Sequence, residues 1–202
     1  MKWDRLADEK KLERTVLALG QRGINTVIAE HKQDAFQKVL SLIPRGAEVM
    51  DLTSTTLDQL GISKEIQESG KYASVRKKIQ MAGQKEMRNA MRKMSAAVDY
   101  AVGSVHAVTE QGQVMIASGS GSQLAPYAFG AGKLIWVVGT QKIVKDLDAG
   151  FQRIQEYSLP LEDARARKVY GVGSGVNKIL IVEREIVPDR ITVVFVKENL
   201  GF

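Results

Sequence analysis

Leu134-Ile135-Trp136-Val137-Val138 is an unbroken apolar run in the second half of the chain. Successive side chains of a strand point to opposite sides of a sheet, so a strand with no polar position is expected to be buried on both faces. Burial of that kind is typical of a mostly parallel sheet flanked by helices. The run therefore predicts the α/β fold class, with residues 134–138 as an interior strand.

The segments around this run alternate between the patterns of helices and strands. Helices are expected at 3–22, 33–43, 146–157 and 161–170, and strands at 26–29, 47–50, 179–182 and 191–196. Leu147, Phe151 and Ile154 are expected on the inward face of the third helix, which Pro160 is expected to end. Alternation of this kind favours parallel strand pairing.

A long helical zone is also expected from about residue 64 to residue 98. Its apolar stripe is formed by Met87, Met91, Met94 and Val98. The opposite, basic face is formed by Lys85, Arg88 and Arg92. The simpler interpretation is an amphipathic helix that buries its methionines. The alternative is a basic face that binds an anionic ligand or partner, since residues 74–97 carry the whole net charge of +6. Nucleic-acid binding is the weaker form of that alternative.

Length and composition limit the class of protein. The 202 residues are expected to form one domain, helix-rich over 1–98 and strand-rich over 99–202, with an N-terminal helical portion. No apolar run is long enough to span a bilayer, and the charged N-terminus does not resemble a signal peptide, so a cytoplasmic protein is expected. The absence of cysteine excludes a thiol nucleophile and a cysteine-ligated cluster in this chain. The sequence predicts no metal site and identifies no cofactor.

Residues 100–109 and 113–117 are expected to be two strands joined by the turn Glu110-Gln-Gly112. Glu110 is the best catalytic candidate, because a carboxylate held in such a turn can act as a nucleophile or a base. Thr109 lies beside it, and His106 precedes it by four residues on the same face of a strand. Gly112 would allow the backbone to come close to a ligand. The alternatives are a solvent-facing Glu110, a local hydrogen bond for Thr109 and a packed His106.

Two loops of small residues are candidates for ligand binding. Their members are Ser118, Gly119, Ser120, Gly121 and Gln123 in the first loop, and Gly171, Gly173, Ser174, Gly175 and Asn177 in the second. Such loops can bind a phosphate or carboxylate through backbone N–H groups, or they can be plain connections. The glycine spacing of the second loop is not that of a dinucleotide site. Lys133, Lys142 and Arg184 could each neutralise an anionic ligand, and nothing local ranks them.

Several of these motifs together resemble the LUD-domain family, the lactate-utilisation proteins typified by LutC and YkgG. The matching segments are Ala107-Val-Thr-Glu-Gln-Gly112, the small residues near Ser118, the strand 134–138, Gln141-Lys-Ile-Val-Lys-Asp-Leu147, the loop 171–177 and the last strand. Their order and spacing match over roughly residues 30–202. The chain departs from the family pattern in its second loop, where Asn177 replaces an aspartate and cannot act as an acid or a base.

The resemblance implies a fold similar to the NagB/RpiA/CoA-transferase superfamily, and a short helix rather than a strand near residue 180. It also implies a role in lactate or related organic-acid utilisation, in which this chain binds a small anionic metabolite as a non-redox subunit beside iron–sulfur proteins. One alternative is an enzyme like an acyl-CoA transferase or sugar-phosphate isomerase, because CoA-transferases use a glutamate in a similar turn as nucleophile. The other is a non-catalytic binding or assembly module. A homodimer is the default expectation.

Overall fold

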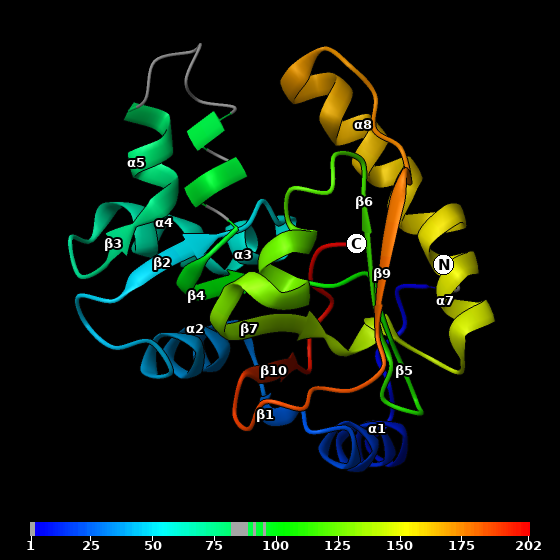
Figure 1. Cartoon of the computed structure of the whole chain (residues 1–202). Helices are drawn as coiled ribbons and strands as arrows, with labels where there is room; N and C mark the ends of the chain where they lie inside the picture. Colours follow the sequence, from blue (N-terminus) through cyan, green and yellow to red (C-terminus); the bar gives the residue numbers. More distant parts are fainter. Residues whose placement is uncertain (1–2, 82–88, 91, 95) are drawn as a thin grey trace.

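The computed structural model describes residues 3–81, 89–90, 92–94 and 96–202. Its main sheet has six parallel strands in the order β1-β10-β7-β4-β2-β3 (Figure 1). In that order their bounds are Asn25–Ala29, Ile191–Val196, Ala131–Gly139, Val98–Gly103, Glu48–Asp51 and Ala73–Ser74. The predicted α/β class with a parallel sheet is confirmed.

The central strand β7 is buried on both faces, as its apolar run predicts. Leu134, Trp136 and Val138 pack in one hydrophobic core, whereas Ile135 and Val137 pack in another on the opposite face. Helices α1 (Glu9–Gln21) and α5 (Val75–Met81) contribute to the first core. Helices α2 (Lys32–Ser41), α3 (Thr55–Leu60) and α4 (Ile62–Glu68) contribute to the second.

A second sheet of four short strands stands beside the first, in the order β8-β5-β6-β9 (Figure 1). The strands span Ile143–Val144, Ala107–Thr109, Val114–Ser118 and Lys178–Val182. The expectation of one strand over 100–109 is wrong, because Ser104, Val105 and His106 carry the chain from β4 into β5 of the other sheet. The strand expected from the β-branched residues at 179–182 is β9, and the short helix implied by the resemblance is not formed there.

The C-terminal helices run without interruption past Pro160. Helix α7 (Leu147–Arg153) continues through the π-helical turn η3 (Ile154–Ser158) into α8 (Leu159–Tyr170), along the outer side of the second sheet (Figure 1). Leu159 N–H donates to the carbonyl of Ile154, five residues earlier. The expectation that Pro160 ends this helix is wrong, because the chain stays helical through η3 into α8, with Pro160 two residues after the π-helical turn.

The long helical zone expected over 64–98 is interrupted. Helix α4 ends at Glu68, and the chain then forms the extended β3 before α5 begins at Val75. Much of the predicted methionine stripe and basic face, including Lys85, Met87, Arg88 and Met91, lies outside the described residues. The remaining elements are a π-helical turn η1 (Pro126–Gly130) and a 3₁₀ turn η2 (Thr140–Lys142). Of the helices in the described ranges, none is long and apolar enough to cross a membrane.

Candidate functional site

A pocket of about 340 Å³ opens where β2, β4 and β7 of the main sheet end. Thr53 and Ser54 follow β2, Ser104 and His106 follow β4, and Lys142 follows β7. The second sheet, the loops at 118–123 and 174–176, and helix α8 complete the wall. Ligands of open parallel sheets bind outside the carboxyl ends of the strands, so the position of this pocket is the expected one.

Lys142 is the most deeply buried charged residue that lines the pocket, with 2% of its surface exposed. Its Nζ donates to Thr56 Oγ1 at 3.2 Å, to Ser104 Oγ at 3.1 Å and to the carbonyl of Val105 at 3.1 Å. All three acceptors are neutral, and no carboxylate of the described residues pairs with Lys142. Burial therefore holds the pKa of Lys142 well below its usual value, and the charge of Arg153 lowers it further.

His106 lines the same pocket as a neutral imidazole. Its Nδ1 accepts a hydrogen bond from the backbone N–H of Ala117 at 3.1 Å, so the neutral ring carries its proton on Nε2. Burial lowers the pKa of His106 to about 3, and the charges of Lys142 and Arg153 act in the same direction. The ring therefore has one N–H donor, Nε2–H, and this donor has no hydrogen-bond partner among the described residues.

Arg153 lies behind His106 and is fully buried. Its Nη1 donates to the carbonyl of His106 at 2.5 Å and to Ser158 Oγ at 3.0 Å, and its guanidinium lies 5.1 Å from the centre of the Tyr157 ring. Nε and Nη2 have no hydrogen-bond partner among the described residues. Burial lowers the pKa of Arg153 to about 10, which still leaves it charged at neutral pH. It adds positive charge beneath the pocket, and no carboxylate of the described residues pairs with it.

Two further arginines line the pocket in ion pairs. Arg76 Nε lies 3.1 Å from Oδ2 of the buried Asp51, and its Nη2 donates to Thr53 Oγ1 at 3.0 Å. Arg165 binds both carboxylate oxygens of Glu162 at 2.7 Å. Glu162 is the single carboxylate side chain among the described residues that line the pocket. Both of its oxygens are already bound by Arg165. Both arginines are thus balanced, and the cations that no carboxylate of the described residues balances are Lys142 in the lining and Arg153 beneath it.

The structure brings the two predicted glycine loops together at this pocket. Asn177 links them, because its backbone N–H donates to the carbonyl of Ser118 at 3.3 Å and its Nδ2 to that of Gly119 at 3.1 Å. The predicted residues that line the pocket are His106, Ser118, Gly119, Ser120, Gln123, Ser174 and Gly175. Gly121 and Asn177 support the loops from beside the pocket, and Gly171 and Gly173 lie at the end of α8.

The turn that contains Glu110 lies at the other end of β6 from the pocket. Glu110 faces α1, where its carboxylate lies 2.8 Å from Arg14 Nη2 and 3.5 Å from Lys11 Nζ. The turn also approaches α1 closely at Gly112, where a β-carbon would lie 2.8 Å from the carbonyl carbon of Ala18. From Val114 to Ser118, strand β6 advances four steps of roughly 3.4 Å each, so about 14 Å separates the two ends of the strand.

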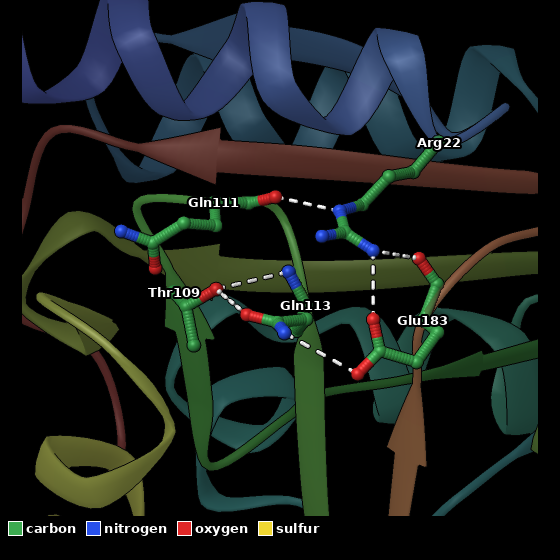
Figure 2. Close-up of polar contacts among 5 residues, drawn as sticks. All are labelled: Arg22, Thr109, Gln111, Gln113 and Glu183. Atoms are coloured by element: carbon green, nitrogen blue, oxygen red, sulfur yellow. Dashed lines mark hydrogen bonds and ion pairs between the residues drawn. The ribbon is translucent and has the colours of Figure 1, made fainter.

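Thr109 belongs to a set of polar contacts that holds this turn in place (Figure 2). Its Oγ1 donates to Gln113 Oε1 at 2.7 Å and accepts from the backbone N–H of Gln113 at 3.0 Å. Gln113 Nε2 donates to the carboxylate of Glu183 at 3.3 Å. The guanidinium of Arg22 donates both to Glu183 and to the carbonyl of Gln111. Thr109, Glu110 and Gly112 thus form a junction between α1 and the second sheet, and their catalytic and binding roles stay predictions.

Sequence reasoning named Lys142 without ranking it, included Arg76 only as part of the basic segment 74–97, and did not find Arg153. A signal for Lys142 was available, because it follows directly on the central buried strand and therefore lies at the carboxyl edge of the sheet. Arg153 gave no such signal, since an arginine in a helix is usually exposed. As for metals, the described residues contain no group of three histidine, aspartate or glutamate side chains that could hold an ion.

Comparison with known proteins identifies the family. The model of the LUD domain matches residues 12–196. The chain belongs to the LUD-domain family. A crystal structure of a DUF162 family protein from Deinococcus radiodurans shares this LUD-domain fold, with a TM-score of 0.57 and 10% identity over 95% of this chain and 99% of that one.

Two other solved structures are less similar to this LUD-domain chain. A ribose 5-phosphate isomerase from Plasmodium falciparum has a TM-score of 0.37 and 15% identity, over 79% of each chain. The eIF2B beta structure from Chaetomium thermophilum has a TM-score of 0.37 and 14% identity, over 57% of this chain and 39% of that one. Among curated proteins, no sequence matches.

Proposed function

We propose that this LUD-domain protein binds a small organic-acid anion in the pocket at the strand ends, and that it serves lactate or related organic-acid utilisation as a non-redox subunit. One observation carries the proposal. Arg76 and Arg165 in the lining are each paired with a carboxylate, Asp51 and Glu162 respectively. Lys142 in the lining and Arg153 beneath it have no carboxylate partner among the described residues. A carboxylate that enters the pocket would supply the missing negative charge.

The lining also suits a small and polar ligand. Hydroxyl groups of Ser118, Ser120 and Ser174 surround the pocket from the two glycine loops, and His106 offers Nε2–H. A few hydrogen-bond donors in a confined space fix the orientation of a small ligand. A carboxylate accepts such bonds at both oxygens, so this lining would distinguish an organic acid from an apolar molecule.

Calorimetric titration with L-lactate, pyruvate, ribose 5-phosphate and acetyl-CoA tests the proposal. The wild type is expected to bind an organic acid, and Lys142→Met is expected to weaken that binding at least about tenfold, or about 1.4 kcal/mol. Lys145→Met is the matched control, because Lys145 is exposed and lies outside the pocket lining. Equal affinity in Lys142→Met and wild type would contradict the proposal. Binding of ribose 5-phosphate or acetyl-CoA alone would favour the isomerase-like or transferase-like alternative.

The expected partner proteins follow from the resemblance to lactate-utilisation proteins. This chain has no cysteine, so any cysteine-ligated iron–sulfur cluster would lie on another chain. We expect iron–sulfur subunits to purify together with this protein from its natural source. Sedimentation of the isolated chain would test whether it is also a homodimer.

A further inference from the structure

The three hydrogen-bond partners of Lys142 are not equivalent. Ser104 Oγ already donates its proton to the carbonyl of Val137 at 2.7 Å, so its oxygen can only accept from Nζ. The carbonyl of Val105 is an acceptor by nature. These two contacts together use two N–H groups of Lys142.

The third partner, Thr56, can act in either direction. Its hydroxyl lies 3.5 Å from the carbonyl of Leu200, a distance at the limit of a hydrogen bond. That carbonyl already accepts from Gln141 Nε2 at 2.7 Å, so it does not require Thr56. The Thr56 hydroxyl is therefore free to turn and donate to a lone pair on Nζ, which lies 3.2 Å away.

Two acceptors and one donor are the set of partners that a neutral amine requires. An amine with this set has two N–H donors and one lone pair. The lone pair faces the Thr56 oxygen, so the Thr56 side chain has to turn aside for a carbonyl carbon to approach Nζ. Desolvation and a neighbouring cation favour the neutral form of a lysine, and here Arg153 is that cation. Lys142 also lines the pocket, with 2% of its surface exposed.

We infer that Lys142 is an amine nucleophile that forms a Schiff base with an anionic carbonyl compound, a 2-oxo acid, bound in this pocket. The inference rests on the proposed function, because it names the substrate class of the same site. A carbonyl carbon is the electrophile that a buried amine attacks. The guanidinium of Arg153, which no carboxylate of the described residues balances, favours a carbonyl compound that carries a carboxylate.

The reaction needs no oxidant and no reductant. The lone pair of Nζ adds to the carbonyl carbon, and the carbonyl electrons move to the oxygen. The nitrogen then loses its two protons, and the oxygen leaves with them as water, which gives the carbon–nitrogen double bond of the imine. The Nε2–H of His106, which lines the same pocket, would hydrogen-bond the oxygen as its negative charge develops. The Thr56 hydroxyl, released from the lone pair, can relay a proton.

Reductive trapping with sodium cyanoborohydride tests this inference. The full-length protein is incubated with pyruvate and the reductant, digested, and mapped by mass spectrometry. Lys142 is expected to carry the reduced adduct more than about tenfold above Lys145 at pH 7, because an ordinary lysine with a pKa of about 10.4 is almost fully protonated there. L-lactate, which has the same charge but no carbonyl, is expected to give no adduct and to reduce labelling of Lys142 by competition. The mapping uses the wild type, so it does not depend on the folding of a variant.

The outcomes separate this inference from the proposed function. Calorimetric binding of pyruvate without an adduct on Lys142 would overturn the Schiff base and leave the binding site standing. Labelling spread evenly over exposed lysines would overturn it as well. Absence of both binding and labelling would overturn the proposed function together with the inference.

Discussion

The phenol oxygen of Tyr127 lies 1.7 Å from the point at which a β-carbon on Gly103 would stand. The two residues fit together because Gly103, the last residue of β4, has no side chain. Tyr127 is buried, donates to the carbonyl of Ser104 at 3.2 Å and packs edge-on against Trp136 at a ring separation of 5.4 Å. This contact fixes the backbone at the point where Ser104 turns toward Lys142.

Gly103→Ala is expected to destabilise the protein by about 1–3 kcal/mol, because the added methyl group overpacks the space that Tyr127 fills. Urea unfolding at pH 7 measures the change. Gly20→Ala is the control, since a β-carbon at Gly20 in α1 meets nothing within 4 Å and should raise stability by about 0.5–1 kcal/mol. A loss that is equal in the two variants would show that the contact with Tyr127 is not the cause.

Arg14 and Glu110 are expected to be coupled weakly. Their ion pair of 2.8 Å joins α1 to the turn between β5 and β6, and 61% of the Arg14 side chain is exposed. Exposed pairs contribute about 0.2–1 kcal/mol, and salt screens them. A double-mutant cycle with Arg14→Gln and Glu110→Gln should give a coupling energy in this range that shrinks in 1 M salt.

The same Glu110→Gln variant tests the predicted catalytic role of the carboxylate. Ligand affinity at the pocket is expected to be unchanged, because Glu110 lies at the opposite end of β6 from the loop at 118–123. A loss of pocket binding, or of any turnover that the wild type shows, would place Glu110 in the site after all.

Stability is expected to fall as the pH decreases from about 6.5 toward 3, because His106 has its pKa lowered to about 3 in the folded protein. The unfolded chain, with an ordinary histidine pKa near 6.5, binds a proton that the folded chain does not bind over this window. The loss between pH 6.5 and pH 5 should be on the order of 1–2 kcal/mol for this residue. Urea unfolding at both pH values measures it.

His106→Asn is the variant for comparison, since asparagine can still accept from the backbone N–H of Ala117 but does not titrate. It should show a smaller loss of stability over the same pH interval. An identical pH dependence in the variant and the wild type would contradict the assignment of this loss to His106.

Arg190 is expected to be essential for stability. It is buried, its Nη1 lies 2.6 Å from Glu185, and its remaining donors bind the carbonyls of Ala131, Pro126 and Tyr127. Arg190→Met would leave Glu185 without its cation and three backbone carbonyls without their donor, at a cost of about 3–5 kcal/mol in the free energy of unfolding. The exposed Arg184→Met should change stability by less than about 0.5 kcal/mol. Similar values for the two variants would show that the buried pair is not needed.

The strands of the main sheet follow from local patterns. Residues 134–138 and 191–196 are apolar at every position or nearly so, and the structure uses both as interior strands. The strand expected over 100–109 failed because three residues at its centre change sheets, and no local pattern distinguishes a change of sheet from a continuous strand. Pro160 was misread because the π-helical turn that precedes it has no sequence signal of its own.

Only part of the candidate site was predictable from the sequence. His106 and the small residues of the two loops were visible as unusual residues beside strands. The importance of Lys142 depends on what is missing around it, a carboxylate, and that is a property of residues far apart in sequence. On helix α7 the expected inward residue Phe151 is 38% exposed, whereas Arg153 is buried in its place. A buried arginine next to a binding pocket overrides the apolar pattern that a helix usually follows.

The π-helical turn at Ile154–Ser158 makes the length of this helix a determinant of which side chains line the pocket. Such a turn holds one residue more than an α-helical turn, and each residue rotates a helix by about 100°. Deletion of one residue within the turn would therefore rotate all of α8 by about that angle, and Glu162, Arg165 and Tyr170 would leave the pocket wall together. A one-residue change in the length of this helix could alter ligand selectivity more than any single substitution on it.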